Sequence, residues 1–483
     1  MPSSTRSLAN SQAGHADGSV VIGQAADVGG AGHAARSARL GRYANRSSPA
    51  SSKQGSKQQR KRKQRLTRWV LRHRLRRLTK LKRVRKCGYC TAGAEGGGPG
   101  LRLTADSEGG NIAGLSGLTT CGSVWACPVC SAKIATRRAD ELADVMRFAL
   151  EQGCSASMVT LTIRHHDGQR LKDCWKAVSK GWEAVTSGKQ WDTDRAKHGL
   201  VGWVRTVEVT HGANGWHVHV HALLIWENKV SQEQAEFVGE RMHRRWTRRV
   251  QKRGFDSLRD SGGLDVRMAT LKPGKGSGLH EYFVKLSHEI TGGQAKLAKG
   301  GGRTPFQILN DVFEAGEAMD VALWQEWEDA SFNRRQLTWS TAPNNLREWA
   351  GLGREQKDEE IAEEELGAED VLFIESDSWC GQRDDRGHYL RNGLRDDPGQ
   401  CCELLAVAED GGYPAVMSWL DRHGMGYVVV ALPPPLPPPP RDHEHWELRR
   451  DRVHELRSVV RGAVRELSEQ REWHRLLREV GIE

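Results

Sequence analysis

Residues 203–226 read WVRTVEVTHGANGWHVHVHALLIW. Apolar and polar side chains alternate on both sides of Asn214-Gly215, a dipeptide that favours a tight reversal between antiparallel strands. On the second strand, this alternation places His217, His219 and His221 on one face and the intervening valines on the other. The stretch therefore predicts a β-hairpin with a row of three imidazoles along one face.

The histidine row predicts a metal site. A rigid strand holds His219 and His221 side by side, and imidazole is a common metal ligand. Glu208, on the preceding strand, brings a carboxylate alongside them if the hairpin closes as predicted. Mixed imidazole and carboxylate ligation suits Mg²⁺ or Mn²⁺ in phosphate chemistry, although a hydrolytic zinc enzyme could use similar ligands. His217 is a less certain ligand, and a half-exposed strand with polar residues outward is the alternative interpretation.

Strand and helix patterns alternate around the hairpin. Residues 156–163 (ASMVTLTI) and 263–271 (GLDVRMATL) have the β-branched character of strands. Helices are predicted from near Ile134, over 231–252 and over about 279–291. This alternation predicts an α+β core, to which the hairpin contributes antiparallel strands.

The predicted helix at 279–291 contains a candidate nucleophile. Tyr282 and Lys285 fall three residues apart and therefore on one helical face. A phenol has a pKa of about 10, so its attack on phosphorus needs nearby positive charge or a polarised target. Lys285 and a metal ion would supply both. Taken alone the pair is weak evidence, because a tyrosine on a helix is usually a core or surface residue.

Three motifs follow one another in a specific order: Thr160-Leu161-Thr162, then His219-Val220-His221, then Tyr282-Phe283-Val284-Lys285. In this order they resemble the HUH endonuclease superfamily. The details are similar to plasmid rolling-circle replication initiator (Rep) proteins of the actinomycete type. Residues 302–309 (GRTPFQIL) and 334–340 (RRQLTWS) also resemble segments of that group, and the resemblance covers roughly residues 87–345.

The resemblance implies a sheet-based palm on which His219 and His221, with Glu208 less securely, bind Mg²⁺ or Mn²⁺. Tyr282 would attack the scissile phosphate, leaving a 5′-phosphotyrosyl enzyme and a free 3′-OH. Expected partners are origin and single-stranded DNA, host helicase and host polymerase. A transposase or relaxase with the same chemistry is the alternative, although a relaxase usually has its tyrosine ahead of the histidines. A non-catalytic zinc-ribbon DNA-binding protein is a third hypothesis.

Paired cysteines predict a second, structural metal site. Cys87 and Cys90 form one CxxC pair, and Cys127 and Cys130 form another after a gap of 36 residues. Four thiolates hold Zn²⁺ tetrahedrally and can organise a segment that is poor in apolar residues. Cys121 is an alternative ligand that could replace one of these. Structural zinc is therefore the favoured interpretation of this N-terminal, zinc-ribbon-like segment, and reduced cysteines without metal are the alternative.

The positive charge is concentrated in one segment. Residues 53–86 contain 17 Lys or Arg and no acid, whereas the whole chain has a net charge of +11, so the remainder is net acidic. Such a segment can neutralise DNA phosphates without reading bases. A solvated or RNA-binding arm is the alternative. The candidate DNA-binding residues are Arg60, Lys61, Arg62, Lys63, Arg65 and Arg68.

Composition divides the chain into six parts. We expect a disordered leader (1–52), a basic nucleic-acid-binding arm (53–86), a zinc-binding segment (87–140), a catalytic domain (145–345), a variable, acidic, loop-rich region ending in a proline-rich linker (346–440), and a terminal helix (441–483).

No apolar stretch reaches the length of a membrane span, and the N-terminus lacks the apolar core of a secretory signal. A cytoplasmic location is therefore expected, and the resemblance to plasmid replication proteins implies a bacterial one.

Overall fold

The structure is a computed structural model that describes residues 57–89, 97–105, 111–269, 302–341, 345–365, 370–386 and 388–430. All of these belong to one compact unit, Gly55–Glu483. The predicted leader, the predicted helices at 279–291 and 441–483, and the proline-rich stretch at 433–440 lie outside the described residues.

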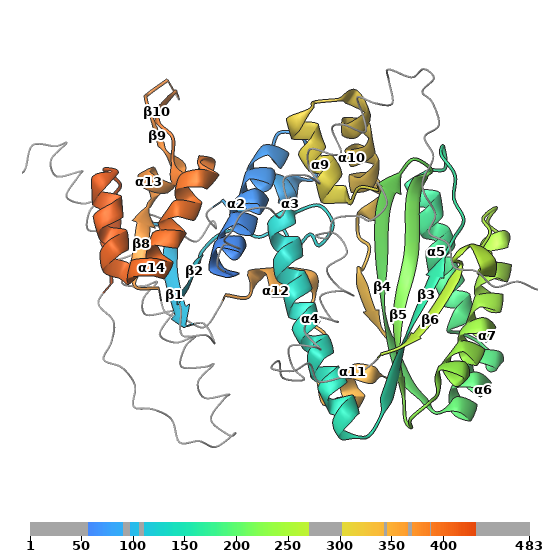
Figure 1. Cartoon of the computed structure of the whole chain (residues 1–483). Helices are drawn as coiled ribbons and strands as arrows, with labels where there is room; N and C mark the ends of the chain where they lie inside the picture. The colour runs from blue at the N-terminus through green and yellow to red at the C-terminus, as the bar shows by residue number, and fades with distance from the viewer. Residues whose placement is uncertain are drawn as a thin grey trace, which may run out of the picture. The chain divides into compact units, whose positions relative to one another are not determined.

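A five-stranded antiparallel sheet contains the predicted hairpin (Figure 1). The strand order is β6-β3-β5-β4-β7, so the hairpin strands β5 and β4 lie inside the sheet. The strands are β3 (Ser155–Thr162), β4 (Leu200–Gly212), β5 (Gly215–Trp226), β6 (Leu264–Met268) and β7 (Leu337–Trp339). The predicted mixed α+β fold with an antiparallel sheet is confirmed.

The hairpin reversal fixes the register of the site. Gly212 pairs with Gly215 across the turn. Gly215 has a φ of +82°, a conformation that L side chains rarely adopt, and a Cβ there would lie 3.1 Å from the carbonyl oxygen of His166. From this turn the pairing places Glu208 directly opposite His219.

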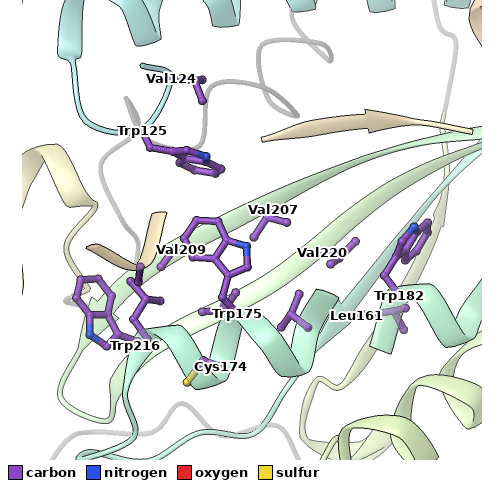
Figure 2. Close-up of a cluster of buried hydrophobic side chains, with 14 of the residues drawn as sticks. Val124, Trp125, Leu161, Cys174, Trp175, Trp182, Val207, Val209, Trp216 and Val220 are labelled. Atoms are coloured by element: carbon purple, nitrogen blue, oxygen red, sulfur yellow. The ribbon is translucent and has the colours of Figure 1, made fainter. Parts of the chain in front are cut away.

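Three helices cover the valine-bearing face of the sheet. These are α5 (Leu171–Val185), α6 (Lys189–His198) and α7 (Gln232–Gln251), the last close to the predicted 231–252 (Figure 1). Val207, Val209 and Val220 from the sheet lie in one buried cluster with Trp175 and Trp182 of α5 (Figure 2). Because the valines that alternate with the histidines are buried here, the imidazoles must point to the opposite face.

Part of the histidine-bearing face is covered by α4 (Pro128–Glu151) and α11 (Leu346–Trp349). Leu142 and Met146 of α4 pack there with Leu223 and Ile225, which continue the row of histidines along β5. The helix begins earlier than the predicted Ile134, because Cys127 is its N-cap and a proline occupies its first position.

Two further helices anchor the hairpin end of β4. They are α9 (Pro305–Glu314) and α10 (Ala318–Ser331). Arg303, just before α9, exchanges backbone hydrogen bonds of 2.7 and 2.8 Å with His211. Its side chain donates to Asp311 and Asp320, both at 2.8 Å. The segment 302–309 therefore joins the edge of the hairpin to α9.

A second, four-stranded sheet has the order β11-β8-β1-β2. Its strands are β1 (Gly97–Ala105), β2 (Asn111–Leu115), β8 (Leu372–Glu375) and β11 (Tyr427–Val429), and it packs against α14 (Pro398–Arg422). The structure thus joins parts of two predicted regions, 87–140 and 346–440. The second region is also richer in helix than expected, since α14 buries Leu404, Leu405 and Ala408 along one face.

The remaining elements surround these two sheets. They are α2 (Lys57–Leu75), α3 (Lys82–Arg85), η2 (Arg259–Ser261), α12 (Asp358–Glu363), α13 (Ser376–Cys380), β9 (Gln382–Arg383), β10 (Tyr389–Arg391) and η3 (Leu394–Asp396). Of these, α2 contacts both α4 and α14.

A buried ion pair between α6 and α7 should be a strong determinant of stability. Asp194 accepts hydrogen bonds from Arg241 at 2.7 Å and from Arg245 at 2.6 Å, and both Asp194 and Arg245 are buried. Asp194→Ala is expected to lower the free energy of unfolding by about 3 kcal/mol, because it leaves a buried cation unpaired. Chemical denaturation measures this change. The control Asp192→Ala, at an exposed site on the same helix, should change stability by less than about 0.5 kcal/mol; equal losses would contradict the prediction.

Candidate metal centres

Glu208, His219 and His221 converge as the sequence predicted. One carboxylate oxygen of Glu208, Oε2, lies 3.0 Å from Nε2 of His219 and 2.9 Å from Nε2 of His221. One potential ligand atom from each residue lies within 4.8 Å of the others. The three side chains come from neighbouring strands with fixed register, so the site is held by the sheet.

A fourth residue orients this site. Oγ1 of Thr160 on β3 lies 3.0 Å from Nδ1 of His221, the ring nitrogen that faces away from Glu208. Such a contact fixes the orientation of the ring and leaves Nε2 for an ion. Nδ1 of His219 is buried and has no hydrogen-bond partner among the described residues. The sequence identified Thr160 only as part of a motif, without this role.

The electrostatics of the group favour ligation. Burial alone would raise the pKa of the Glu208 carboxyl group, but the hydrogen bonds with His219 and His221 outweigh it and hold that pKa well below its usual range. Burial lowers the pKa of His219. A carboxylate and a neutral imidazole are the protonation states that a metal ion requires.

His217 is a neighbour of the three converging residues. Its ring centroid lies 4.9 Å from that of His219 and 4.9 Å from that of His165, which follows β3. Burial, followed by the nearby His219, lowers the pKa of His217 to about 4. His217 and His165 therefore extend the row of imidazoles, and neither belongs to the group whose ligand atoms converge with Glu208. No motif in the sequence had singled out His165.

Loss of the Thr160 hydroxyl should weaken metal binding. We expect Thr160→Val to lower the affinity for Mn²⁺ by about 10- to 100-fold, because the His221 ring loses the group that orients it. Isothermal titration calorimetry with the purified protein measures this affinity. Thr162→Val is the matched control, because Thr162 lies on the same strand as Thr160 and pairs with His219 of β5. Among the described residues, no side-chain hydrogen bond links Thr162 to an imidazole. Equal losses in both variants would contradict the role of Thr160.

Four cysteines form the second centre. Cys87, Cys121, Cys127 and Cys130 are all buried, with Sγ–Sγ distances of 3.7 Å (Cys87–Cys127 and Cys87–Cys130) and 3.6 Å (Cys121–Cys130). Thiolates held about 2.3 Å from a tetrahedral Zn²⁺ lie about 3.8 Å apart. The donor set and its spacing therefore fit a structural zinc ion.

Three separate segments bring these cysteines together. Cys87 follows α3, Cys121 follows β2, and Cys127 and Cys130 lie at the start of α4, where the helix dipole stabilises thiolates. Gly88, at a φ of +81°, donates its N–H to Thr119 O at 2.7 Å and so holds the first segment near the second. Cys90 lies outside the described residues. Cys121, the alternative ligand considered from the sequence, is the fourth thiol of the group that the described residues form.

The six candidate DNA-binding residues lie on α2 in different environments. Arg62 donates to both Glu409 (2.7 Å) and Asp410 (2.6 Å) of α14, and Arg65 donates to Glu409 at 2.5 Å. The side chain of Arg68 is half-buried and reaches Gln64 at 3.2 Å. The other three, Arg60, Lys61 and Lys63, are exposed. Two of the six cations therefore hold α2 against α14.

Tyr282 and Lys285 lie outside the described residues. The described chain is fixed on both sides of them. Ala269 donates its N–H to Ala156 O on β3 at 2.8 Å, and Arg303 pairs with His211 on β4. Both flanks therefore attach to the sheet that carries Glu208, His219 and His221.

Comparison with known proteins identifies a family. Residues 115–371 match the model of a family described as "Replication protein", which is more than half of the chain. This match confirms the resemblance to replication proteins that the sequence motifs indicated. Within the described residues, no helix is long and apolar enough to cross a membrane.

Two curated relatives come from Streptomyces. A "Protein rep" of Streptomyces lividans is 26% identical over 306 residues, which cover 49% of this chain and 64% of that protein. A "Neomycin resistance protein" of Streptomyces cyanogenus is 31% identical over 134 residues, which cover 23% of this chain and 31% of that protein. The chain thus spans less than two thirds of the length of either relative. No solved structure matches it.

Proposed function

This chain belongs to the replication protein family, and from that premise we propose that it initiates plasmid rolling-circle replication by nicking one DNA strand at the origin. Its substrates are origin DNA and the single strand exposed there. Host helicase and polymerase are the partners that such an initiator requires, because the nick leaves a 3′-OH primer for extension.

The observation that carries this proposal is the convergence of Glu208, His219 and His221 on the hairpin, with Thr160 behind His221. Two imidazoles and a carboxylate are a donor set that fits Mn²⁺ or Mg²⁺. When bound there, a divalent ion supplies a positive charge that polarises the scissile phosphate. The five-stranded sheet serves as the palm that presents this group to DNA.

The proposed covalent step uses Tyr282. Its phenolic oxygen attacks the phosphorus, a bond forms between that oxygen and phosphorus, and the bond from phosphorus to the 3′ oxygen breaks. The phenol releases its proton to solvent, and the departing 3′ oxygen takes up a proton from solvent to become the 3′-OH, while the 5′ phosphate stays on the tyrosine. Lys285, one helical turn away by sequence, would stabilise the phenolate.

Chain reach supports this role of Tyr282. Ala269 lies level with Ala156 on β3, and His219 pairs with Thr162, six residues further along that strand. Six strand residues span about 20 Å. The 13 residues from Ala269 to Tyr282 span up to about 43 Å when extended. The tyrosine is therefore within reach of the metal site from its fixed flank.

Formation of a covalent adduct tests the proposal. Purified protein is incubated with single-stranded oligonucleotides that tile the plasmid origin, with Mn²⁺ or with EDTA. The label is at the 3′ end, because the proposed bond joins protein to the 5′ phosphate of the downstream fragment. A labelled, protein-sized band that appears only with Mn²⁺ is the expected result. Absence of both adduct and cleavage across the whole origin would overturn the proposal and favour a protein that only binds DNA.

A further inference from the structure

A short segment between α2 and the cysteine centre carries a row of exposed cations. Residues 77–86 read RLTKLKRVRK. Thr79 and Val84 are buried, while Arg77, Lys80, Lys82 and Lys86 are exposed. We name these four exposed residues the basic ridge.

Hydrogen bonds to neighbouring parts of the fold hold the backbone of the basic ridge in place. Glu328 of α10 accepts a hydrogen bond from the Thr79 hydroxyl and, at 3.0 Å, another from the N–H of Lys80. Arg85 donates to the carbonyl oxygen of Thr79 at 2.8 Å. At its end the segment runs directly into Cys87 of the cysteine centre. The four cations are therefore presented on an anchored backbone, which reduces the entropy lost when they bind a partner.

The charges of the basic ridge are not neutralised within the described part of the chain. None of Arg77, Lys80, Lys82 and Lys86 forms an ion pair with a described residue, whereas Arg83 between them lies 3.3 Å from Glu359. This distinguishes the ridge from Arg62 and Arg65, which are paired with α14. This exposed concentration of unpaired positive charge, which contrasts with the net acidic remainder of the chain, favours association with a polyanionic partner.

We propose that the basic ridge binds the phosphate backbone of duplex DNA and holds it independently of base sequence. This inference rests on the proposed function, since an initiator must hold duplex DNA at the origin before a single strand is nicked. The four residues that contact duplex DNA are then Arg77, Lys80, Lys82 and Lys86. Arg62 and Arg65 have a separate role, which is to hold α2 against α14.

The composition of the segment favours duplex over single-stranded DNA. Single-strand sites combine positive charge with aromatic side chains that stack on bases, and residues 77–86 contain no aromatic residue. Base readout commonly uses Asn, Gln, Ser or Thr beside Arg, and the one such residue here, Thr79, is buried against Glu328. What remains is a set of cations suited to phosphates.

Salt dependence of binding tests the inference. In the full chain, Arg77, Lys80, Lys82 and Lys86 are replaced together by Gln, and binding to a labelled 24-base-pair duplex of arbitrary sequence is followed by fluorescence anisotropy over a KCl series. Each lost phosphate contact reduces the slope of log K against log salt by about 0.9. We expect the slope to fall by roughly 2 to 4, with unchanged zinc content and thermal midpoint.

Two control variants keep the result specific. A charge-matched variant replaces the exposed Lys172, Lys176, Lys189 and Lys197 of α5 and α6 by Gln, and its slope should change by less than about 1. Arg62→Gln with Arg65→Gln should lower the thermal midpoint and leave the slope of the folded protein unchanged. Equal slope changes in the ridge and charge-matched variants would overturn the inference, as would a change seen only with single-stranded DNA or RNA.

The inference and the proposed function can fail separately. Tyr282→Phe should retain the full salt slope on duplex DNA, because the ridge does not take part in the covalent step. The ridge variant should still form the adduct on a short single-stranded oligonucleotide. If wild-type protein binds duplex DNA with the expected salt slope but forms no adduct, the nicking proposal is refuted. The assignment of duplex binding to the basic ridge is then unaffected.

Discussion

Tyr282→Phe is expected to reduce formation of the covalent DNA adduct by on the order of 10³-fold or more, to below detection. The substitution removes only the phenolic oxygen, which is the atom proposed to bond to phosphorus, and no other group at this position can replace it. The measurement is the single-stranded assay with Mn²⁺ and a 3′-labelled oligonucleotide, followed by mass spectrometry of the peptide that carries the nucleotide. In wild-type protein this peptide should contain Tyr282.

A matched variant makes this test specific. Tyr427→Phe removes the same atom from β11 of the second sheet, and it should retain wild-type adduct yield. If Tyr282→Phe still forms the adduct, the nucleophile is another residue, even if nicking itself is real. Replacement of both His219 and His221 by Ala should also abolish the adduct, but it should abolish Mn²⁺ binding too, which Tyr282→Phe should leave intact.

Cys121→Ser is expected to remove zinc from the protein, whereas Cys90→Ser should retain roughly one zinc per chain. The reason is that Cys121 is the fourth thiol of the buried group with Cys87, Cys127 and Cys130. Zinc binding supplies on the order of 10 kcal/mol in isolated finger peptides, so its loss should strongly lower the thermal midpoint. Metal content is measured by mass spectrometry of the purified chain, and unfolding is measured by circular dichroism.

The opposite pattern would show that the ligand set includes Cys90. In that case the two CxxC pairs would act together, as the sequence alone indicated. Cys380→Ser is the control, since this residue lies in α13 and is not a member of the four-cysteine group, and its replacement should leave zinc content unchanged. If all three variants retain zinc, neither Cys121 nor Cys90 is a required ligand, and the four-cysteine zinc centre is refuted.

Local patterns predicted the parts of the fold that neighbouring residues determine. Alternation around Asn214-Gly215 gave β4 and β5, and their register followed from the turn. Because Glu208 and His219 lie on the two arms of one hairpin, their approach could be predicted without knowing the rest of the sheet. Helix α7 was predicted within a residue at each end, since its Ser231 cap is encoded locally.

Contacts between distant segments could not be predicted in this way. Thr160 reaches His221 only because β3 pairs with β5, and the two residues are 61 positions apart. Cys121 lacks a CxxC partner, so its sequence indicated it only as an alternative ligand, and the fold was needed to place it with the other three. The pairing of Arg62 with Glu409 spans 347 positions. From the sequence alone, the basic segment 53–86 and the acidic residues of the later chain are interpreted as two separate surfaces. The fold pairs some of their charges with one another, as for Arg62 and Glu409.

The four-stranded sheet has a consequence for how the chain folds during synthesis. Leu101 of β1 pairs with Leu372 of β8, so about 270 residues must be translated after β1 before its partner exists. At about 5–20 residues per second, the ribosome needs roughly 15–50 s for this. During that interval the β1–β2 pair has an unpaired edge, which can associate with other nascent chains. Release of a chain that stops before residue 372 would make this exposure permanent.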